Sequence, residues 1–457
     1  MINFSSIAYV LASVLFILGI KKLSHPKTAR DGNFIAAFGM LIAIVATLIS
    51  YGQIDFKLII IGMIIGAIIG ATFAIKVEMT QMPQMVAIFN GFGGGASALV
   101  AAAEFLNSST ITTFTMSTII ISIFIGTLTL TGSFIAFGKL QGFISGQPIV
   151  FPGQQVLNAI LAIALLVAGF FVVETSGEMN FFFVVLAISA ILGVTLTIPI
   201  GGADMPVVIS LLNSYSGIAA AATGFVLMNN GLIISGALVG ASGLILTNIM
   251  CKGMNRSLAN VIFGAVGLEQ ESSGSGTEKQ ISIKSYSTEE AAMIFDAAEK
   301  VIVVPGYGLA VAQAQHAVRE VAEFLEKKGK TVLYAIHPVA GRMPGHMNVL
   351  LAEANIPYDQ LKDLEEVNPE FEDCDVALVL GANDVVNPAA RHDTSSPIYG
   401  MPILDVDKSR TVIINKRTMN TGFAGIQNEL FGFDNSIMVF GDAKDMLQQL
   451  LKDLKEL

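Results

Sequence analysis

A glycine-rich turn after the apolar run 301–304 carries the clearest chemical signal in the sequence. The run ends at Pro305, and Gly306, Tyr307 and Gly308 follow before an amphipathic helical pattern. Strand, glycine turn and helix in this order are typical of the start of a dinucleotide-binding unit, in which glycines allow a tight turn and a close approach of backbone to a pyrophosphate. The alternative is an ordinary strand-to-helix turn, and the context favours nucleotide binding.

The same glycine spacing recurs at Gly91, Gly93 and Ala96, where it predicts something different. No strand pattern precedes this copy, and it lies inside a long apolar segment. Glycines in such segments let two helices pack closely, so we assign them no chemistry. Close packing is also expected at a further set of glycines spaced four residues apart, Gly62, Gly66, Gly70, Gly236 and Gly240.

A basic pair, Lys416 and Arg417, follows the apolar run 411–415. Units that bind NAD usually place an acid after their second strand, but here that strand ends at Ile336 and His337 follows. A basic pair at the carboxyl end of a strand could instead bind the 2′-phosphate of NADP, with arginine able to bind it bidentately. Solvated surface charges are an equally open interpretation of the pair.

Two further loops, 337–348 and 381–390, are rich in Gly, Pro and Asn and follow predicted strands. Ligands of doubly wound sheets lie at such strand ends. Arg342 could face a phosphate, and Asp384 could accept a hydrogen bond from a ribose or an amide. Either residue could instead cap a helix, and Asp384 is well placed to do so.

The elements that must position these loops are short β-branched runs alternating with amphipathic helical patterns. This alternation predicts an α/β Rossmann-like doubly wound parallel sheet over residues 285–457, ending in a helix at 443–455. A polar segment rich in Ser and Gly predicts a linker at 265–284. The runs are 301–304, 331–336, 375–380, 411–415 and 436–440.

The first part of the chain, residues 1–264, reads as a polytopic helical membrane domain. It contains nine apolar segments, each near the roughly 20 residues that a bilayer requires. The predicted transmembrane helices are 4–20, 34–50, 56–75, 83–106, 115–138, 156–173, 181–200, 206–228 and 231–250.

Charge is distributed unevenly between the two parts. Residues 1–256 contain nine basic and seven acidic residues, whereas the remainder contains 17 basic and 29 acidic residues. An acidic C-terminal part argues against nucleic acid as a partner. Eight of the nine basic residues of the first part fall on connections of one side, which the positive-inside rule places in the cytoplasm. We therefore expect a cytoplasmic C-terminal domain and an N-terminus outside the membrane.

Four longer blocks resemble the beta subunit of proton-translocating NAD(P) transhydrogenases. They are residues 201–217, 337–354, 381–390 and 416–428, and the likeness runs through nearly the whole chain in the same order. The resemblance implies hydride transfer between NADH and NADP⁺, coupled to proton movement, with NADP(H) bound by the C-terminal domain in a reversed orientation. The competing interpretation is a transporter or channel with a nucleotide-sensing cytoplasmic domain. The missing acid after the second strand and the lack of a filter-like loop count against it.

The resemblance also implies which segments contact NADP(H), residue by residue. Phe423 stands where relatives often have tyrosine, so a hydroxyl contact from that position is absent here. The implied contacts are Gly306, Tyr307, Gly308, Leu309, Ala310, Val311, Ala312, Val339, Ala340, Gly341, Arg342, Met343, Pro344, Gly345, Gly381, Ala382, Asn383, Asp384, Lys416, Arg417, Gly422, Phe423, Ala424 and Gly425.

Three residues of the membrane part are candidates for the proton path and its coupling. Asn90 and Asn213 lie in predicted spans that the resemblance implies are wet. Many relatives have histidine at the position of Asn90, and an asparagine does not titrate at ordinary pH. Asp204 lies in the loop 200–206, where we hypothesise that it takes or releases the proton. Its alternatives are a solubilising loop acid and an N-cap of the eighth span.

The lack of a titrating residue at position 90 and of a second dinucleotide-binding pattern implies partner subunits. The chain has one dinucleotide-type pattern, so NAD(H) must bind to another chain. The resemblance implies one or more alpha subunits that carry the NAD(H)-binding domain and further transmembrane helices, including an ionisable membrane residue. It also implies a dimer of alpha–beta units, surrounded by lipid in a bacterial inner membrane. We expect no metal site.

Overall fold

The computed structural model describes residues 4–50, 56–77, 81–108, 111–175, 177–254, 257–263, 282–341, 345–396, 398–422 and 424–457. The described residues form two compact units. The membrane unit lies within Met1–Asn248 and Leu258–Gly267, and the nucleotide unit lies within Ile249–Ser257 and Leu268–Leu457. The predicted boundaries at 264 and 285 stay predictions, because 264–281 lie outside the described residues.

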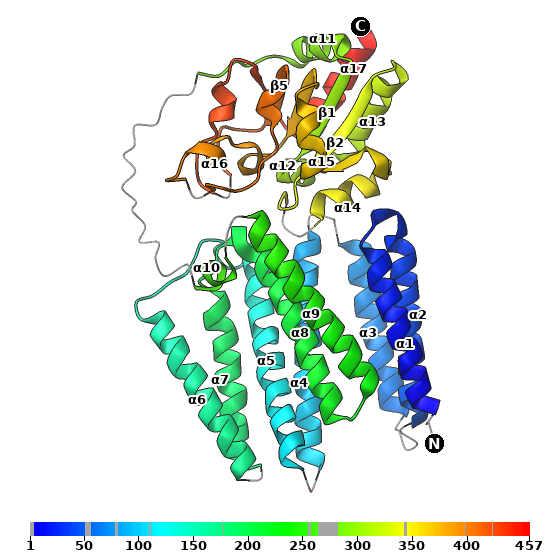
Figure 1. Ribbon diagram of the computed structural model, residues 1–457, viewed down its shortest axis with the longest axis vertical. Helices are drawn as coiled ribbons and strands as arrows, with labels where there is room; N and C mark the ends of the chain where they lie inside the picture. The colour runs from blue at the N-terminus through cyan, green and yellow to red at the C-terminus, as the bar shows by residue number, and fades with distance from the viewer. Residues whose placement is uncertain are drawn as a thin grey trace. The chain divides into compact units, whose positions relative to one another are not determined.

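Within the described ranges, nine helices are long and apolar enough to cross a membrane (Figure 1), which confirms the predicted count. The second begins at Pro26, well before the expected residue 34, because proline suits a first helical position and the helix continues through charged residues before its apolar part. They are α1 Phe4–Leu23, α2 Pro26–Ser50, α3 Phe56–Lys76, α4 Met82–Asn107, α5 Thr113–Gln141, α6 Gln154–Glu174, α7 Met179–Thr197, α8 Met205–Val226 and α9 Asn230–Gly253, and the short α10 spans Leu258–Phe263.

Helices α5 and α8 form the centre of the membrane unit. Helix α5 packs against α4, α7 and α8, while α1 packs on α2 and α6 packs on α7. The share of the span buried inside the chain is 56% in α5 and 61% in α8, compared with none in α3. Among the described spans, α8, which carries Asn213, therefore has the largest buried share.

The glycine predictions for the membrane unit have two outcomes. Close packing is confirmed at Gly236, where an added Cβ would lie 2.4 Å from the backbone nitrogen of Ala221, and at Gly91, where it would lie 3.0 Å from Ser133 Cβ. It is wrong for α3. No described atom of this chain lies within 4 Å of an added Cβ at Gly62, Gly66 or Gly70.

The nucleotide unit contains a six-stranded parallel sheet in the order β3-β2-β1-β4-β5-β6, as described residues define it. This order is that of a doubly wound dinucleotide-binding sheet and confirms the predicted fold class. Five strands match the predicted runs. The sixth, the edge strand β3, has the short polar sequence LKD and gave no β-branched signal. The strands are β1 Lys300–Pro305, β2 Thr331–Ile336, β3 Leu361–Asp363, β4 Val376–Leu380, β5 Thr411–Lys416 and β6 Ser436–Phe440.

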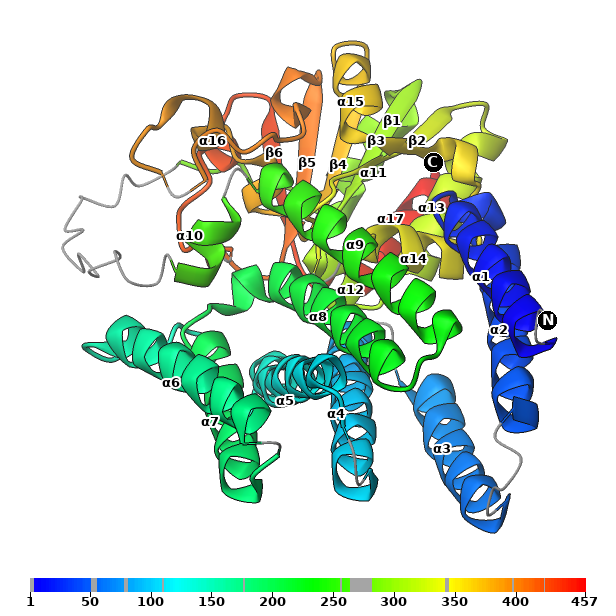
Figure 2. The same ribbon diagram turned by 60° about the horizontal axis from the view of Figure 1, so that its bottom comes forward.

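Helical segments cover both faces of this sheet (Figure 2). Helices α11 Thr288–Ala297, α13 Gln315–Lys327 and α17 Ala443–Glu456 pack together. Side chains of α15 Leu364–Val367 and of the 3₁₀ turn η5 Asn368–Phe371 join a core cluster with alternate strand residues. Burial on both faces explains why the central strands are continuous apolar runs.

The helix expected after Gly308 is interrupted. A short α12 Tyr307–Val311 precedes α13, and Gln313 between them has a left-handed φ of 48°. The remaining helical segments lie in the connections: α14 His346–Glu353, α16 Ala389–His392, and the 3₁₀ turns η2 Gly202–Asp204, η4 Tyr358–Gln360, η6 Asp384–Val386, η7 Val406–Lys408 and η8 Glu429–Gly432.

Candidate functional site

Four neighbouring strands bring the predicted nucleotide-binding loops to one edge of the sheet. In the order β2-β1-β4-β5, the loops that begin at His337, Gly306, Gly381 and Arg417 follow one another. All four strands are parallel, so their carboxyl ends share this edge. The strand order reverses between β1 and β4, which is the switch point where such sheets bind ligands.

The loops after β1 and β4 are in backbone contact. Gly306 N donates to Leu380 O at 2.9 Å, and Gly308 N donates to Gly381 O at 3.0 Å. A Cβ on Gly306 would lie 2.4 Å from Ala382 Cα, and a Cβ on Gly308 would lie 2.6 Å from Gly381 Cα. The contact between the two loops is therefore a sufficient reason for both glycines. Their predicted role toward a pyrophosphate stays a prediction.

Side chains of the loop after β1 are divided between core and surface. Leu309 and Ala310 are fully buried, so their side chains belong to the core of the unit. Tyr307 and Ala312 are half-buried, and Val311 is exposed. Among these implied contacts, only the backbone and the half-buried or exposed side chains are available to a ligand.

The basic pair divides between two environments. Lys416 is half-buried, and its Nζ donates to Asn383 Oδ1 at 3.0 Å and to Asn420 O at 2.8 Å. Burial lowers the pKa of Lys416, against an opposing effect of the Asp384 carboxylate. Arg417 is exposed. Lys416 thus connects the loops after β4 and β5, and Arg417 offers a solvent-facing guanidinium.

Asp384 connects the loop after β4 to the lid, which we define as residues 422–425. Its carboxylate accepts from Asn383 Nδ2 at 2.9 Å and from Ala424 N at 3.0 Å. An added Cβ on Gly422 would lie 2.6 Å from Asp384 Oδ1, so the lid backbone lies against the carboxylate. The helix-cap interpretation of Asp384 is wrong, because this side chain is bound to the lid instead. Gly425 has a left-handed φ of 70°.

Two buried asparagines that the sequence did not single out join the same loops. We call Asn387 and Asn428 the asparagine braces; they are 0% and 1% exposed. Asn428 Nδ2 donates to Asn383 O at 2.9 Å, and Asn387 Nδ2 donates to Gln427 O at 3.1 Å. Both lie inside the blocks that carried the resemblance. That position was the available signal, since loop asparagines otherwise read as turn residues.

The loop after β2 is fastened by a buried histidine. His337 is 2% exposed, its Nε2 lies 2.7 Å from Pro402 O, and its Nδ1 accepts from Val339 N at 3.2 Å. Since Nδ1 accepts, the proton of the neutral ring is on Nε2, which donates. Burial lowers the pKa of His337 to about 4, against an opposing effect of the Pro402 carbonyl.

Other implied contacts of this loop have mixed outcomes. Val339 is half-buried and Ala340 is buried. Gly341 has a φ of 103°, and an added Cβ there would lie 2.4 Å from His346 Nδ1, so only glycine fits. Gly345 is exposed just before α14. Four predicted residues, Arg342, Met343, Pro344 and Phe423, lie outside the described residues.

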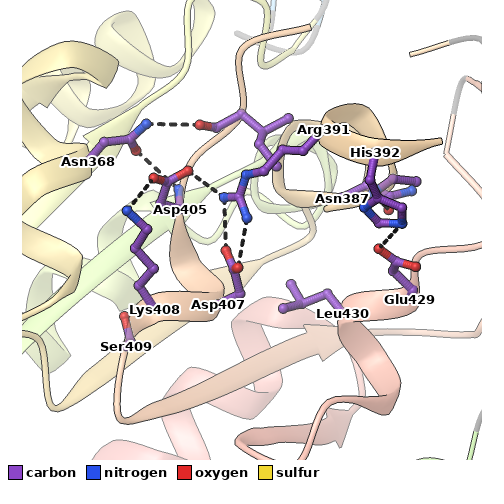
Figure 3. Close-up of polar contacts among 12 residues, drawn as sticks. Asn368, Asn387, Arg391, His392, Asp405, Asp407, Lys408, Ser409, Glu429 and Leu430 are labelled. Carbon is purple, nitrogen blue, oxygen red and sulfur yellow. Dashed lines mark hydrogen bonds and ion pairs between the residues drawn. The ribbon is translucent and has the colours of Figure 1, made fainter. Parts of the chain in front are cut away.

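Ion pairs fasten the segment that follows the β4 loop (Figure 3). Arg391 in α16 binds Asp405, and its Nη1 lies 2.7 Å from Asp407 Oδ2. His392 Nε2 lies 3.2 Å from Glu429 Oε1 of η8. Both interactions are partly exposed, so each adds modestly to the connections made by the buried amides.

The membrane candidates converge on α8. Asn90 in α4 donates from Nδ2 to Ile209 O of α8 at 3.4 Å, about one helical turn before half-buried Asn213. Asp204 is half-buried at the end of η2, directly before α8. Asp204 occupies the N-cap position of α8, as one of the alternatives had it, but its side chain makes no capping hydrogen bond there.

The donors at the sheet edge fit a phosphorylated dinucleotide. An exposed guanidinium and a half-buried ammonium lie at the end of β5, and glycine backbone lines the neighbouring loops. Guanidinium and ammonium groups bind phosphate by charge-assisted hydrogen bonds. The described residues hold no cluster of three His, Cys, Asp or Glu side chains able to bind an ion.

A polytopic helical unit and a doubly wound sheet with basic residues at its ligand edge define a class, the membrane proteins that carry a dinucleotide-binding domain. The family model "NAD(P) transhydrogenase beta subunit" matches residues 5–453, and the chain belongs to this family. Two sequences from Rhodospirillum rubrum, each named NAD(P) transhydrogenase subunit beta, are 53% identical to it over 454 residues. The alignments cover 97% of this chain and 98% of each relative. These findings confirm the expected family and enzyme class, and nothing in them favours the channel interpretation.

Proposed function

We propose that this chain binds NADP(H) and couples hydride transfer between NADH and NADP⁺ to proton translocation across a membrane. One observation carries the proposal. Four loops on adjacent strand ends meet at the switch point of the sheet, with a basic pair at the end of β5, in a chain that also has nine apolar helices within its described part. Family membership supports NADP(H) as the ligand in general terms.

The residues that would hold NADP(H) have separable roles. Exposed Arg417 binds the 2′-phosphate through its planar guanidinium. Lys416 adds positive charge and at the same time holds the loop after β4. Asp384 orients the lid through Ala424 N. The remaining implied contacts on the four loops supply backbone groups. NADP(H), when bound, supplies a nicotinamide ring that accepts or releases hydride.

The NAD(H) site belongs to a partner. Hydride transfer needs two dinucleotides, and the described residues of this chain form one doubly wound sheet. The relatives are named as beta subunits, which supports an alpha partner. We extend this to one or more alpha subunits with an NAD(H)-binding domain and further membrane helices, assembled as a dimer of alpha–beta units. The positive-inside pattern supports an inner-membrane location, an outer N-terminus and a cytoplasmic nucleotide unit.

The proton path uses Asn90 and Asn213 as polar lining and Asp204 as the titrating group. The contact of Asn90 with the backbone of α8 supports a common path along that helix. The spans contain no histidine in sequence, because His25, His316, His337, His346 and His392 all lie outside the apolar segments. A partner helix therefore contributes a further ionisable group near the two asparagines.

Coupling requires that the proton and the nucleotide bias one conformational equilibrium. Asp204 is the only acid in the loop between α7 and α8. In the proposal its carboxylate takes a proton from one aqueous side and returns it during turnover. Its change of charge alters the conformational preference that NADP(H) also alters.

Vesicles that contain the assembled enzyme test the proposal. With NADH and NADP⁺, the assembled enzyme transfers hydride and moves protons, and the chain without its partner does neither. The Asp204→Asn variant keeps its side-chain size but loses the charge, so proton-coupled turnover falls about a hundredfold, within the range for a lost proton-transfer group. Its NADPH affinity is unchanged. Pumping by the chain alone, or normal turnover by Asp204→Asn, contradicts the account.

A further inference from the structure

Lys139 is a charged side chain buried where two loops of the membrane unit meet. It lies in the last turn of α5 and is 5% exposed. Its Nζ donates to Ile200 O at 2.8 Å and to Gln147 O at 3.0 Å. Ile200 belongs to the loop between α7 and α8, which carries Asp204, and Gln147 belongs to the loop after α5. One ammonium therefore links a helix end to both loops.

Backbone hydrogen bonds join the same two loops to each other. Gly202 N donates to Gly146 O at 2.8 Å, only two residues before Asp204. Ile149 N donates to Ile198 O at 3.4 Å at the other end of the contact. The two loops thus form one small assembly, and Lys139 attaches this assembly to α5. The position of Asp204 depends on that attachment.

Burial of an ammonium at this place costs free energy, and packing alone does not explain why a lysine is there. A charged group loses hydration when buried, and a neutral side chain of similar volume avoids this loss. The two acceptors of Lys139 are neutral carbonyl oxygens, which hydrogen-bond the charge without neutralising it. Asp204 is the only acidic residue on the two loops. A fixed positive charge that holds the loop of a titrating carboxylate gives the cation a reason to be there.

We propose that Lys139 is a positioning residue for Asp204. It holds the loop between α7 and α8 in the arrangement in which the Asp204 carboxylate exchanges a proton with the aqueous side. This inference rests on the proposed role of Asp204 in proton translocation. Without the ammonium, Ile200 O and Gln147 O lose their shared donor and the loop leaves its place on α5, while the nucleotide unit keeps its own contacts.

The test compares variants of the assembled enzyme, with its partner, in vesicles. Lys139→Met lowers the kcat of proton-coupled transhydrogenation about tenfold or more, a loss typical of a misplaced reacting group. The KM for NADPH is unchanged. Lys139→Arg keeps the charge and the donors, and it restores most of the rate. Lys76→Met is the matched control, since Lys76 is an exposed lysine in the last turn of α3 and its loss leaves the rate unchanged.

A double-variant cycle shows whether Lys139 acts through Asp204. If it does, Lys139→Met combined with Asp204→Asn is no slower than Asp204→Asn alone, because the two changes remove one function. Rates that multiply instead, or a normal kcat for Lys139→Met, overturn the inference. Normal turnover of Asp204→Asn by itself overturns the proposed proton role, so the two failures are distinguishable.

A purely structural role gives a different pattern. It lowers the amount of assembled enzyme but leaves the kcat per assembled enzyme near normal, and that result contradicts the inference. If Lys139→Met does not assemble, Lys139→Gln carries the same test, because its amide retains two N–H donors without the charge. A slow Lys139→Gln variant beside a near-normal Lys139→Arg variant supports the inference. A Lys139→Gln variant with a normal rate overturns it, because the positive charge is then not needed.

Discussion

Lys139 in the membrane unit and His337 in the nucleotide unit are both buried basic side chains that link two loops through backbone carbonyls. They do so in opposite states. Neutral His337 donates from one ring nitrogen and accepts with the other. Lys139 donates from Nζ to two carbonyl oxygens, as the ammonium of a lysine does. Histidine gives up its proton to be buried and serves structure, whereas the lysine retains a charge next to the loop of a proposed proton-transfer residue.

The loops around the two residues also differ in how they are held. The loops of the nucleotide unit are cross-linked by several independent side chains, including Lys416, Asp384 and the asparagine braces. In the loop that carries Asp204, the side chain of Lys139 links Ile200 O to the end of α5. Single substitutions should therefore impair function most in the membrane unit, and alter stability more than chemistry in the nucleotide unit.

Acid should break the contact of His337 with Pro402 O and leave the contacts of Lys139 in place. The pKa of His337 is about 4 in the folded chain and near 6.5 when unfolded, so the unfolded state binds the extra proton first. Stability is complete above pH 6.5 and falls as the pH drops toward 4, by about 3 kcal/mol at most. Denaturant unfolding of the nucleotide unit in the full chain, at pH 7 and pH 4.5, measures this loss.

The matched control for this prediction is His316→Gln, because His316 is exposed. The stability of this variant should depend on pH as that of the wild type does. His337→Gln removes the titrating ring, so its pH dependence over the same interval is much weaker. An unaltered dependence in His337→Gln contradicts the assignment of a neutral, structural role.

Glycine contacts sharpen the comparison within the membrane unit. Gly236→Val places a side chain against the Ala221 backbone of α8 and should destabilise the unit by about 1–3 kcal/mol through overpacking. Gly66→Val in α3 meets no described atom of this chain within 4 Å and should leave the thermal unfolding of the purified chain unchanged. Equal losses of thermal stability in the two variants would contradict the packing described for α8 and α9.

The smallest expected effect concerns the asparagine braces. Asn428→Ala leaves Asn383 O without its donor and should lower the free energy of unfolding by about 1–2 kcal/mol, with weaker NADPH binding as the lid loosens. Asn435→Ala removes two similar hydrogen bonds to backbone away from the lid, to Asp407 O and Ser409 O. It should lower stability without changing NADPH affinity. Identical effects on affinity would show that the lid does not depend on Asn428.

The sequence predicted the elements well because long apolar segments and β-branched runs report directly on burial. It missed β3, whose three residues at the sheet edge include two charged ones, and the break at Gln313 inside a helical pattern. It also missed Lys139, because a lysine at the end of a span reads as a marker of orientation. The small-residue spacing on α3 predicted packing that no described part of the chain supplies, since spacing alone does not say what covers a helix.

The candidate site was predicted as a set of loops, but not as a network. That the loops share one edge follows from strand order, which the βαβ pattern implied. The division of work between Lys416 and Arg417 did not follow, because neighbouring cations look alike until one is seen to bind Asn383. The binding of Asp384 to the lid likewise depends on a tertiary contact that no local pattern encodes.

Cofactor discrimination by the basic pair tests the central claim most directly. The full-length chain is titrated with NADPH and with NADH, as wild type and as the Lys416→Ala, Arg417→Ala double variant. The wild type should prefer NADPH, and the double variant should lose about ten- to a hundredfold of that preference, since a charge-assisted phosphate contact contributes about 1.5–3 kcal/mol. An unchanged preference in the double variant would contradict NADP(H) binding at the carboxyl edge of this sheet.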